Sequence, residues 1–174
     1  MNRARSILLD QIVAEVATNG LADRSLRDIA EAVGSSHRML HYHFGSRAGL
    51  VAALVAATES AHRDLLIETA SEVSDPAELV IELWHRVSSP ELRPFVRLFF
   101  ECVAVTGGEG LTDPWIEVAA QIADTMGVLP DEDELRLGVA VTRGLLIDVL
   151  ANDDATAATR SIERFVEMWN LKAN

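Results

Sequence analysis

The spacing of apolar residues predicts a short helix that begins after Ser25. Four apolar side chains share one side of it, at positions i, i+3, i+4 and i+7: Leu26, Ile29, Ala30 and Val33. Ser25 can cap the first turn, and Asp28 supplies the reciprocal carboxylate of a capping box. Gly34 is placed to end the helix, because glycine adopts a left-handed cap without steric penalty.

A second short helix follows at once, and most of its surface is polar. Ser35 and Ser36 can cap it, while Leu40 and Phe44, at i and i+4, form its inward side. The other side chains are mostly hydrogen-bonding groups: Ser36, His37, Arg38, His41, Tyr42 and His43. A recognition helix needs such groups to face a groove and its phosphates. The stretch Ser25–Leu50 therefore predicts a helix-turn-helix that binds double-stranded DNA.

A long third helix is predicted from Ser46 to about Glu72, as a connector between two domains. Arg47 lies in its first turn, where a cation is unfavourable against the helix dipole, and an external phosphate would offset that cost. Prolines divide the later chain into helical segments near 76–88, 91–106, 114–127 and 131–152. The prediction is an all-α protein of about nine helices, with a helix-turn-helix domain at 1–47 and an effector-binding and dimerisation domain at 48–174.

Charge is distributed unevenly between these two parts. The chain has 174 residues and a net charge of −12, but residues 1–50 hold six arginines against five acids. The remainder holds nine bases against 22 acids. A DNA-binding face needs only local positive potential, so the acidic body is compatible with specific binding.

The sequence contains no pattern that indicates a membrane or secreted protein. No apolar run approaches the roughly 20 residues that cross a bilayer, and Asp10 interrupts the apolar stretch near the N-terminus. The single cysteine, Cys102, excludes an internal disulfide and fits a reducing compartment. We expect a cytoplasmic protein with no membrane partner.

The last two helices carry apolar stripes that predict a homodimer. One stripe comprises Leu135, Val139, Thr142, Leu146 and Val149, and a second comprises Leu137, Val141 and Leu145. Two such helices from each of two subunits would form a four-helix bundle around a two-fold axis. The predicted interface is Leu137, Val141, Leu145, Ile162, Phe165, Val166 and Trp169. The alternative is that both stripes are filled within one chain.

The middle helices could enclose a small, mostly apolar effector. Their candidate ligand-binding residues are Trp84, His85, Phe95, Phe99, Cys102, Trp115, Met126 and Arg143. Each of them also fits an ordinary core or surface position.

Residues spread over the first three helices resemble a known family. The amphipathic segment Arg5–Gly20, then Arg24–Ala30, Gly34, Leu40–Phe44 and Ser46–Arg47, are similar to the DNA-binding domain of the tetracycline-repressor (TetR) family. The resemblance implies a homodimeric transcription regulator that binds a palindromic DNA operator. It also implies a small-molecule effector whose binding changes the spacing of recognition helices that sit about 34 Å apart on DNA.

The family pattern also implies which residues contact DNA: Ser25, Arg27, Ser36, His37, Arg38, Met39, His41, Tyr42, His43 and Arg47. The last four fall at phosphate-clamping positions. Three positions depart from the pattern. The usual tyrosine after Leu40 is His41, with Tyr42 about 100° further around the helix, while Ser35 replaces an apolar residue and Arg47 a lysine.

The function predicted from these observations is a repressor that an apolar or amphipathic molecule releases from DNA, with no enzymatic activity and no cofactor. An alternative is a helical dimer that binds a small molecule or a protein but no specific DNA. A third is a metal-dependent helical enzyme, since His37, His41 and His43 could be considered zinc ligands. No carboxylate is fixed beside these histidines, and we expect no metal site. Because imidazoles titrate near pH 6.5, a phosphate contact by His41 should strengthen on acidification.

Overall fold

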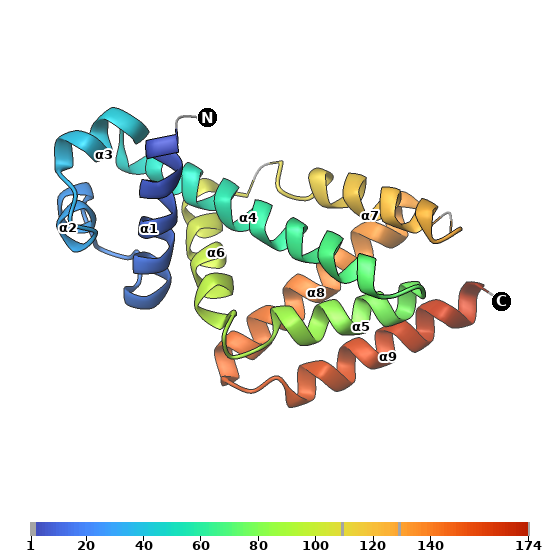
Figure 1. Ribbon diagram of the computed structural model, residues 1–174. Coiled ribbons are helices and arrows are strands. Elements are labelled where there is room, and N and C mark those ends of the chain that lie inside the picture. Colours follow the sequence, from blue (N-terminus) through green and yellow to red (C-terminus); the bar gives the residue numbers. More distant parts are fainter. Residues whose placement is uncertain (1–2, 109, 129, 174) are drawn as a thin grey trace. The chain divides into compact units, whose positions relative to one another are not determined.

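The computed structural model describes residues 3–108, 110–128 and 130–173, and all regular structure in these ranges is helical (Figure 1). The helices are α1 (Arg3–Asn19), α2 (Leu26–Ala32), α3 (His37–Phe44), α4 (Arg47–Glu72), α5 (Pro76–Val87), α6 (Arg93–Thr106), α7 (Asp113–Thr125), α8 (Glu132–Asn152) and α9 (Thr156–Ala173). The all-α class and the predicted helix order are confirmed. None of the helices in the described ranges is long and apolar enough to cross a membrane.

The helices group into two compact units. Unit 1 comprises Met1–Ala61 with Pro94–Glu109, and unit 2 comprises His62–Arg93 with Gly110–Asn174. Helix α6 thus belongs with the N-terminal helices, although it follows α5 in the chain. This division differs from the predicted boundary between residues 47 and 48, because a boundary read along the sequence assigns a later helix to the later domain.

Unit 1 contains the predicted helix-turn-helix. Ser25 caps α2: its Oγ accepts a hydrogen bond from the Asp28 amide (3.2 Å), and Asp28 Oδ2 accepts one from the Ser25 amide (2.8 Å). The Ser25 hydroxyl, followed by its amide, lowers the pKa of Asp28 below the usual carboxyl value. Gly34, with a φ of +65°, follows α2 as the left-handed residue the sequence requires. Ser36 caps α3 through a 3.2 Å bond from the Met39 amide.

The core of unit 1 is formed by side chains from several helices. Ile12, Ile29, Leu40, Leu50 and Leu54 are all fully buried. The backbone at the end of α3 also lies very close to the backbone at the start of α4. A Cβ added at Gly49 would lie 2.1 Å from the Phe44 carbonyl oxygen, so only glycine fits there.

Unit 2 has its own core, formed around Trp84 of α5. The Trp84 side chain is 1% exposed, and its Nε1 donates a 2.9 Å hydrogen bond to Thr159 Oγ1 of α9, which packs on α5. Leu146 and Val149 of the first predicted α8 stripe are buried, as is Ile162 of α9. Helix α8 packs against both α7 and α9.

Two predicted dimer-interface residues lie in this core instead. Ile162 is fully buried and Val166 is 7% exposed within one chain, so neither is open to a second copy. Trp169 is half-buried and its ring approaches Gly138 of α8 within one protomer. The helical period allowed either side of α9 to face inward, and the packing of α5 and α8 on α9 selects the side that carries Ile162 and Val166.

One side of α8 remains open to solvent and consists mostly of small and apolar residues, with the exposed Asp148 among them. We call it the α8 face: Leu137, Ala140, Gly144, Ile147 and Ala151, spaced alternately three and four residues apart. Leu137 is 52% exposed and Ile147 is 54% exposed. Only Leu137 among these belongs to the second predicted stripe, since Val141 and Leu145 are half-buried. The alternation is the spacing of a helix seam that packs against other helices.

Candidate nucleic-acid interface

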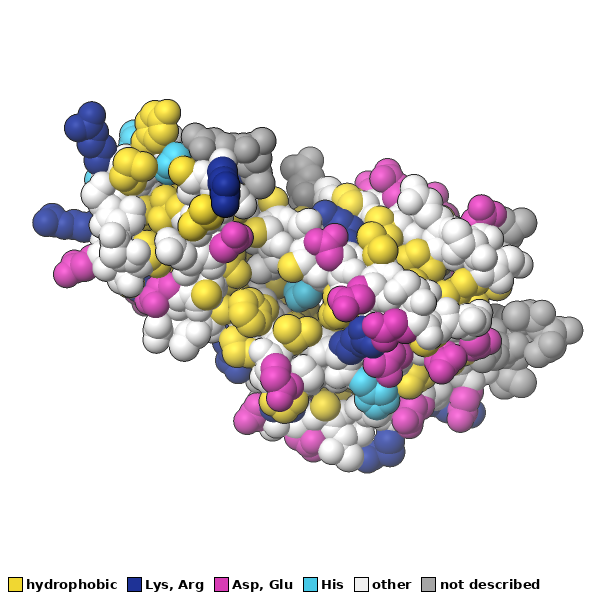
Figure 2. All heavy atoms as spheres, in the orientation of Figure 1, with side chains coloured by type: hydrophobic (Ala, Val, Ile, Leu, Met, Phe, Trp, Pro, Cys, Tyr) yellow, Lys and Arg dark blue, Asp and Glu magenta, His cyan; other side chains and the backbone are white. Residues whose placement is uncertain are grey.

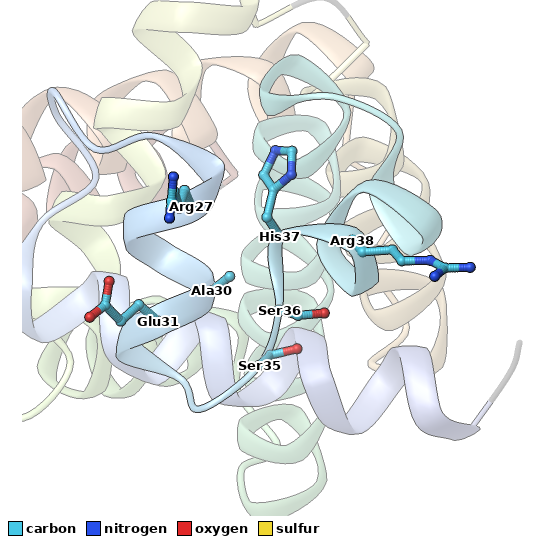
Figure 3. Close-up of a pocket in the computed structure, with 7 residues that line it drawn as sticks. All are labelled: Arg27, Ala30, Glu31, Ser35, Ser36, His37 and Arg38. Carbon is cyan, nitrogen blue, oxygen red and sulfur yellow. The ribbon is translucent and has the colours of Figure 1, made fainter.

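An open pocket of about 460 Å³ lies between α2 and α3 (Figure 3). We call this surface the reading face, and it is lined by Arg27, Ala30, Glu31, Ser35, Ser36, His37 and Arg38. Arg27 and Glu31 come from α2, the two serines from the turn, and His37 and Arg38 from the first turn of α3. The pattern of apolar residues explains this arrangement, because Ile29 and Leu40 turn inward and leave the polar sides of both helices outside.

The rest of the exposed α3 surface continues the reading face. Met39 is 43% exposed and Tyr42 is 76% exposed, and His41 is also exposed. The His37 and His41 rings lie one helical turn apart, with centroids 6.2 Å from each other. Helix α3 carries no acidic residue, so the charged group it presents is the Arg38 guanidinium.

Figure 2 shows the contrast in charge between the two units on the side that it displays. Arginine side chains project from the unit that carries α2 and α3, whereas Asp and Glu side chains gather over unit 2. In the close-up, Arg38 extends away from α2 (Figure 3). Because no hydrogen bond or ion pair occupies this guanidinium within the described residues, its donors are available to an acceptor outside the protein.

Two of the predicted DNA contacts are used inside the protein. The Ser25 hydroxyl is engaged with Asp28 in the capping box. Arg47 donates from Nε to the Arg24 carbonyl (2.9 Å) and from Nη2 to the Leu21 carbonyl (3.1 Å). The expectation that a phosphate offsets the Arg47 charge is therefore wrong for this edge of the guanidinium, because backbone carbonyls of unit 1 accept its hydrogen bonds.

His43 is less exposed than His41 and Tyr42, which precede it in α3. Its side chain is half-buried, and its ring stacks edge-on with Tyr42 at 5.0 Å between centroids. Its carbonyl accepts a 3.3 Å hydrogen bond from Arg5 Nε of α1, whose guanidinium lies over the Phe44 ring. Arg5 thus fastens the end of α3 to α1. Among the described residues, no group of three or more His, Cys, Asp or Glu side chains could hold a metal ion.

Three residues that line the pocket were not predicted to lie there: Ala30, Glu31 and Ser35. Ala30 was predicted only as a member of the apolar side of its helix. Glu31 lies one turn after Arg27 on the same side of α2, so its position was readable from the helical period. Ser35 was noticed only as a departure from the family pattern. In the structure it lines the pocket from the turn between the two helices.

The predicted ligand-binding residues are distributed over both units. Trp84, Trp115, Met126 and Arg143 belong to unit 2, whereas Phe95, Phe99 and Cys102 belong to unit 1, and His85 is exposed on α5. Arg143 holds the segment before α7: it donates to Thr112 Oγ1 (3.0 Å) and to the Leu111 carbonyl (3.2 Å). Burial raises the pKa of the Cys102 thiol to about 11, which keeps it protonated.

His62 is the titratable group of unit 2 that its surroundings alter most. Burial, with a smaller contribution from the nearby Arg143 cation, lowers the pKa of His62 to about 4. Its imidazole is therefore neutral at pH 7.

The geometry of unit 1 defines the class of protein. Two short helices are joined by a tight turn, the second has an exposed and basic surface, and α1 braces both; this is a helix-turn-helix DNA-binding domain. Residues 8–54 match the family described as bacterial regulatory proteins, tetR family.

Solved structures share the fold over nearly the whole chain. A TetR-family transcriptional regulator from Pectobacterium atrosepticum has 20% identity and a TM-score of 0.76, with 97% of this chain and 95% of that chain covered. The TetR-like regulator LfrR from Mycobacterium smegmatis, in complex with proflavine, has 17% identity and a TM-score of 0.65 (96% and 97% covered). The multidrug binding protein EbrR, complexed with imidazole, has 25% identity and a TM-score of 0.64 (94% and 95% covered).

No curated relative matches the chain by sequence. The family match thus assigns a tetR-type DNA-binding domain to residues 8–54, and the solved structures show that the chain shares the fold of TetR-family regulators.

Proposed function

We propose that the protein is a homodimeric repressor that leaves a palindromic operator when a small apolar or amphipathic molecule binds unit 2. The observation that carries the dimer is the α8 face, an exposed and mostly apolar stripe on a long helix, with Asp148 beside it. An exposed apolar surface of this kind is typical of a site where another protein packs. Dimerisation through it would supply two reading faces, one for each half of a two-fold operator.

Helix α9 also has an exposed side with helical spacing. Its exposed residues Ala157, Ser161, Arg164 and Met168 recur at intervals of three and four, and Met168 is 50% exposed. Helices α8 and α9 pack together within one chain. Two copies of this helix pair would form a four-helix bundle.

Gly144 provides a direct test of the dimer. A Cβ added there meets no atom within 4 Å in the protomer, so a longer side chain is tolerated unless a second chain lies against it. We expect Gly144→Arg to fold and to sediment as a monomer, while Ala120→Arg on the exposed side of α7 stays dimeric. A wild-type protein that sediments as a monomer at micromolar concentration would refute the dimer.

The effector is proposed on the likeness to relatives with ligands, LfrR with proflavine and the multidrug binding protein EbrR with imidazole. Unit 2 contributes aromatic Trp115 and the neutral imidazole of His62, which suit an apolar molecule with one polar group.

A DNA-release assay tests this part. A duplex selected by the wild-type protein from a random pool is bound, and proflavine with a panel of apolar and amphipathic compounds is titrated in. We expect at least one compound to weaken DNA binding tenfold or more. If none alters the DNA affinity while the protein remains a specific DNA binder, the ligand-responsive repressor is excluded.

A further inference from the structure

The turn that joins α1 to α2 has an unusual backbone. Gly20 has a φ of +80°, and Asp23 has a φ of +59°, a left-handed conformation that residues other than glycine rarely adopt. Such a residue persists only when its surroundings hold it in place. The turn also sets where α2 begins, and α2 carries Arg27 to the reading face.

Side chains from several helices hold this turn. Arg24 donates from Nη1 to the Gly20 carbonyl (3.2 Å) and from Nη2 to Glu15 Oε1 of α1 (2.9 Å). Arg47, in the first turn of α4, binds the Leu21 and Arg24 carbonyls, and Glu101 Oε2 of α6 accepts a longer, 3.4 Å bond from the Leu21 amide. The turn is thereby connected to α1, α4 and α6 within unit 1.

The geometry of Arg47 accounts for the choice of arginine at this position. Nε and Nη2 form one edge of the planar guanidinium, and each donates to a different carbonyl. A lysine ammonium is a single point charge and does not reproduce this two-donor fork. The cation at the start of α4, unfavourable against that helix dipole, is stabilised by the two carbonyl oxygens.

We propose that Arg47 is a positioning residue for DNA recognition: it fixes the turn at 20–25, and so the placement of Arg27, instead of binding a phosphate. The proposal rests on the DNA-binding function of unit 1 and requires neither the dimer interface nor the effector. It assigns to the arginine a task different from the phosphate clamp that the family pattern implies for this position.

Salt dependence separates these two roles, because a lost phosphate contact lowers the salt slope by about one. Binding is measured for a duplex selected by the wild-type protein and for a random-sequence duplex of equal length. For Arg47→Gln we expect about tenfold weaker binding of the selected duplex. Binding of the random duplex and both salt slopes should stay as in the wild type.

Two matched variants calibrate the slope. Arg38→Gln, on the exposed side of α3, should lower it by about one per protomer, and Arg160→Gln, exposed on α9, should leave it unchanged. If Arg47→Gln lowers the slope as Arg38→Gln does and weakens both duplexes equally, Arg47 is a phosphate contact. If Arg47→Gln changes nothing, the turn does not need Arg47. Either result overturns the proposal.

Arg47→Lys keeps the charge and the fold, so it gives an answer even if the glutamine variant fails to fold. A positioning role predicts several-fold weaker binding of the selected duplex, with faster amide hydrogen exchange over residues 20–26 in the free full-length protein. A phosphate clamp predicts wild-type affinity and unchanged exchange in Arg47→Lys. That second pair of results would also overturn the proposal.

Discussion

The reading face and the α8 face are both exposed surfaces, yet they suit opposite partners. The reading face presents Arg27, His37 and Arg38, whose hydrogen-bonding groups suit a polyanion. The α8 face presents Leu137, Ala140, Gly144, Ile147 and Ala151, which offer an approaching chain only apolar contact. In the proposed dimer, recognition of DNA and recognition of a second copy are thus separated on helices of different polarity.

The largest effect is expected from Gly49→Ala, which disturbs the close contact between the end of α3 and the start of α4. A methyl group there would lie 2.1 Å from the Phe44 carbonyl oxygen, so α3 or α4 must move. We expect a loss of about 3 kcal/mol in the free energy of unfolding, together with weakened DNA binding. Chemical denaturation measures the first and fluorescence anisotropy the second. Ala52→Gly, at an exposed position of the same helix, is the control and should cost about 1 kcal/mol. Equal losses in the two variants would show that the close approach does not matter.

The half-buried imidazole of His62 should make the folded state less stable in acid. His62 has a folded-state pKa of about 4, below the unfolded value of 6.5, so the unfolded chain binds more protons between these pH values. The free energy of unfolding should therefore fall by about 2 kcal/mol between pH 7 and pH 5. His62→Gln should reduce this dependence, as measured by denaturation at both pH values. An undiminished slope in His62→Gln would assign the effect to other groups.

Removing a charge from the reading face should affect DNA alone. We expect Arg38→Gln to weaken binding of a selected duplex by about 1 to 3 kcal/mol, while the sedimentation of the free protein is unchanged. Gly144→Arg, by contrast, should change the sedimentation of the free protein from dimer to monomer. A change of oligomeric state in Arg38→Gln would break the separation between the two faces.

Local rules predicted the helix-turn-helix well. The Ser25 and Asp28 capping box, the left-handed Gly34 and the buried Leu40 all follow from chemistry within one turn of helix, which the sequence contains. Long-range contacts were not predictable in this way. The carbonyls that accept from Arg47 belong to residues 21 and 24, and no local pattern connects them to position 47.

The helical period predicts which residues share one side of a helix, but it does not predict which side is buried. It showed that α8 has two apolar stripes and placed Leu137 on the exposed one. It could not identify Gly144 and Ile147 as members of the same exposed stripe, since small and apolar residues are equally compatible with a core. The assignment of α9 failed for the same reason, because burial of Ile162 and Val166 depends on where α5 and α8 pack.

In the proposed assembly each chain supplies one reading face, and two chains joined through the α8 face bind one operator. Sedimentation of the protein with a duplex selected from a random pool measures the number of chains on each duplex. We expect two chains per duplex on a palindromic site with half-sites about one helical turn apart, and loss of this complex in Gly144→Arg. One chain per duplex in the wild type, or an unchanged complex in Gly144→Arg, would contradict it.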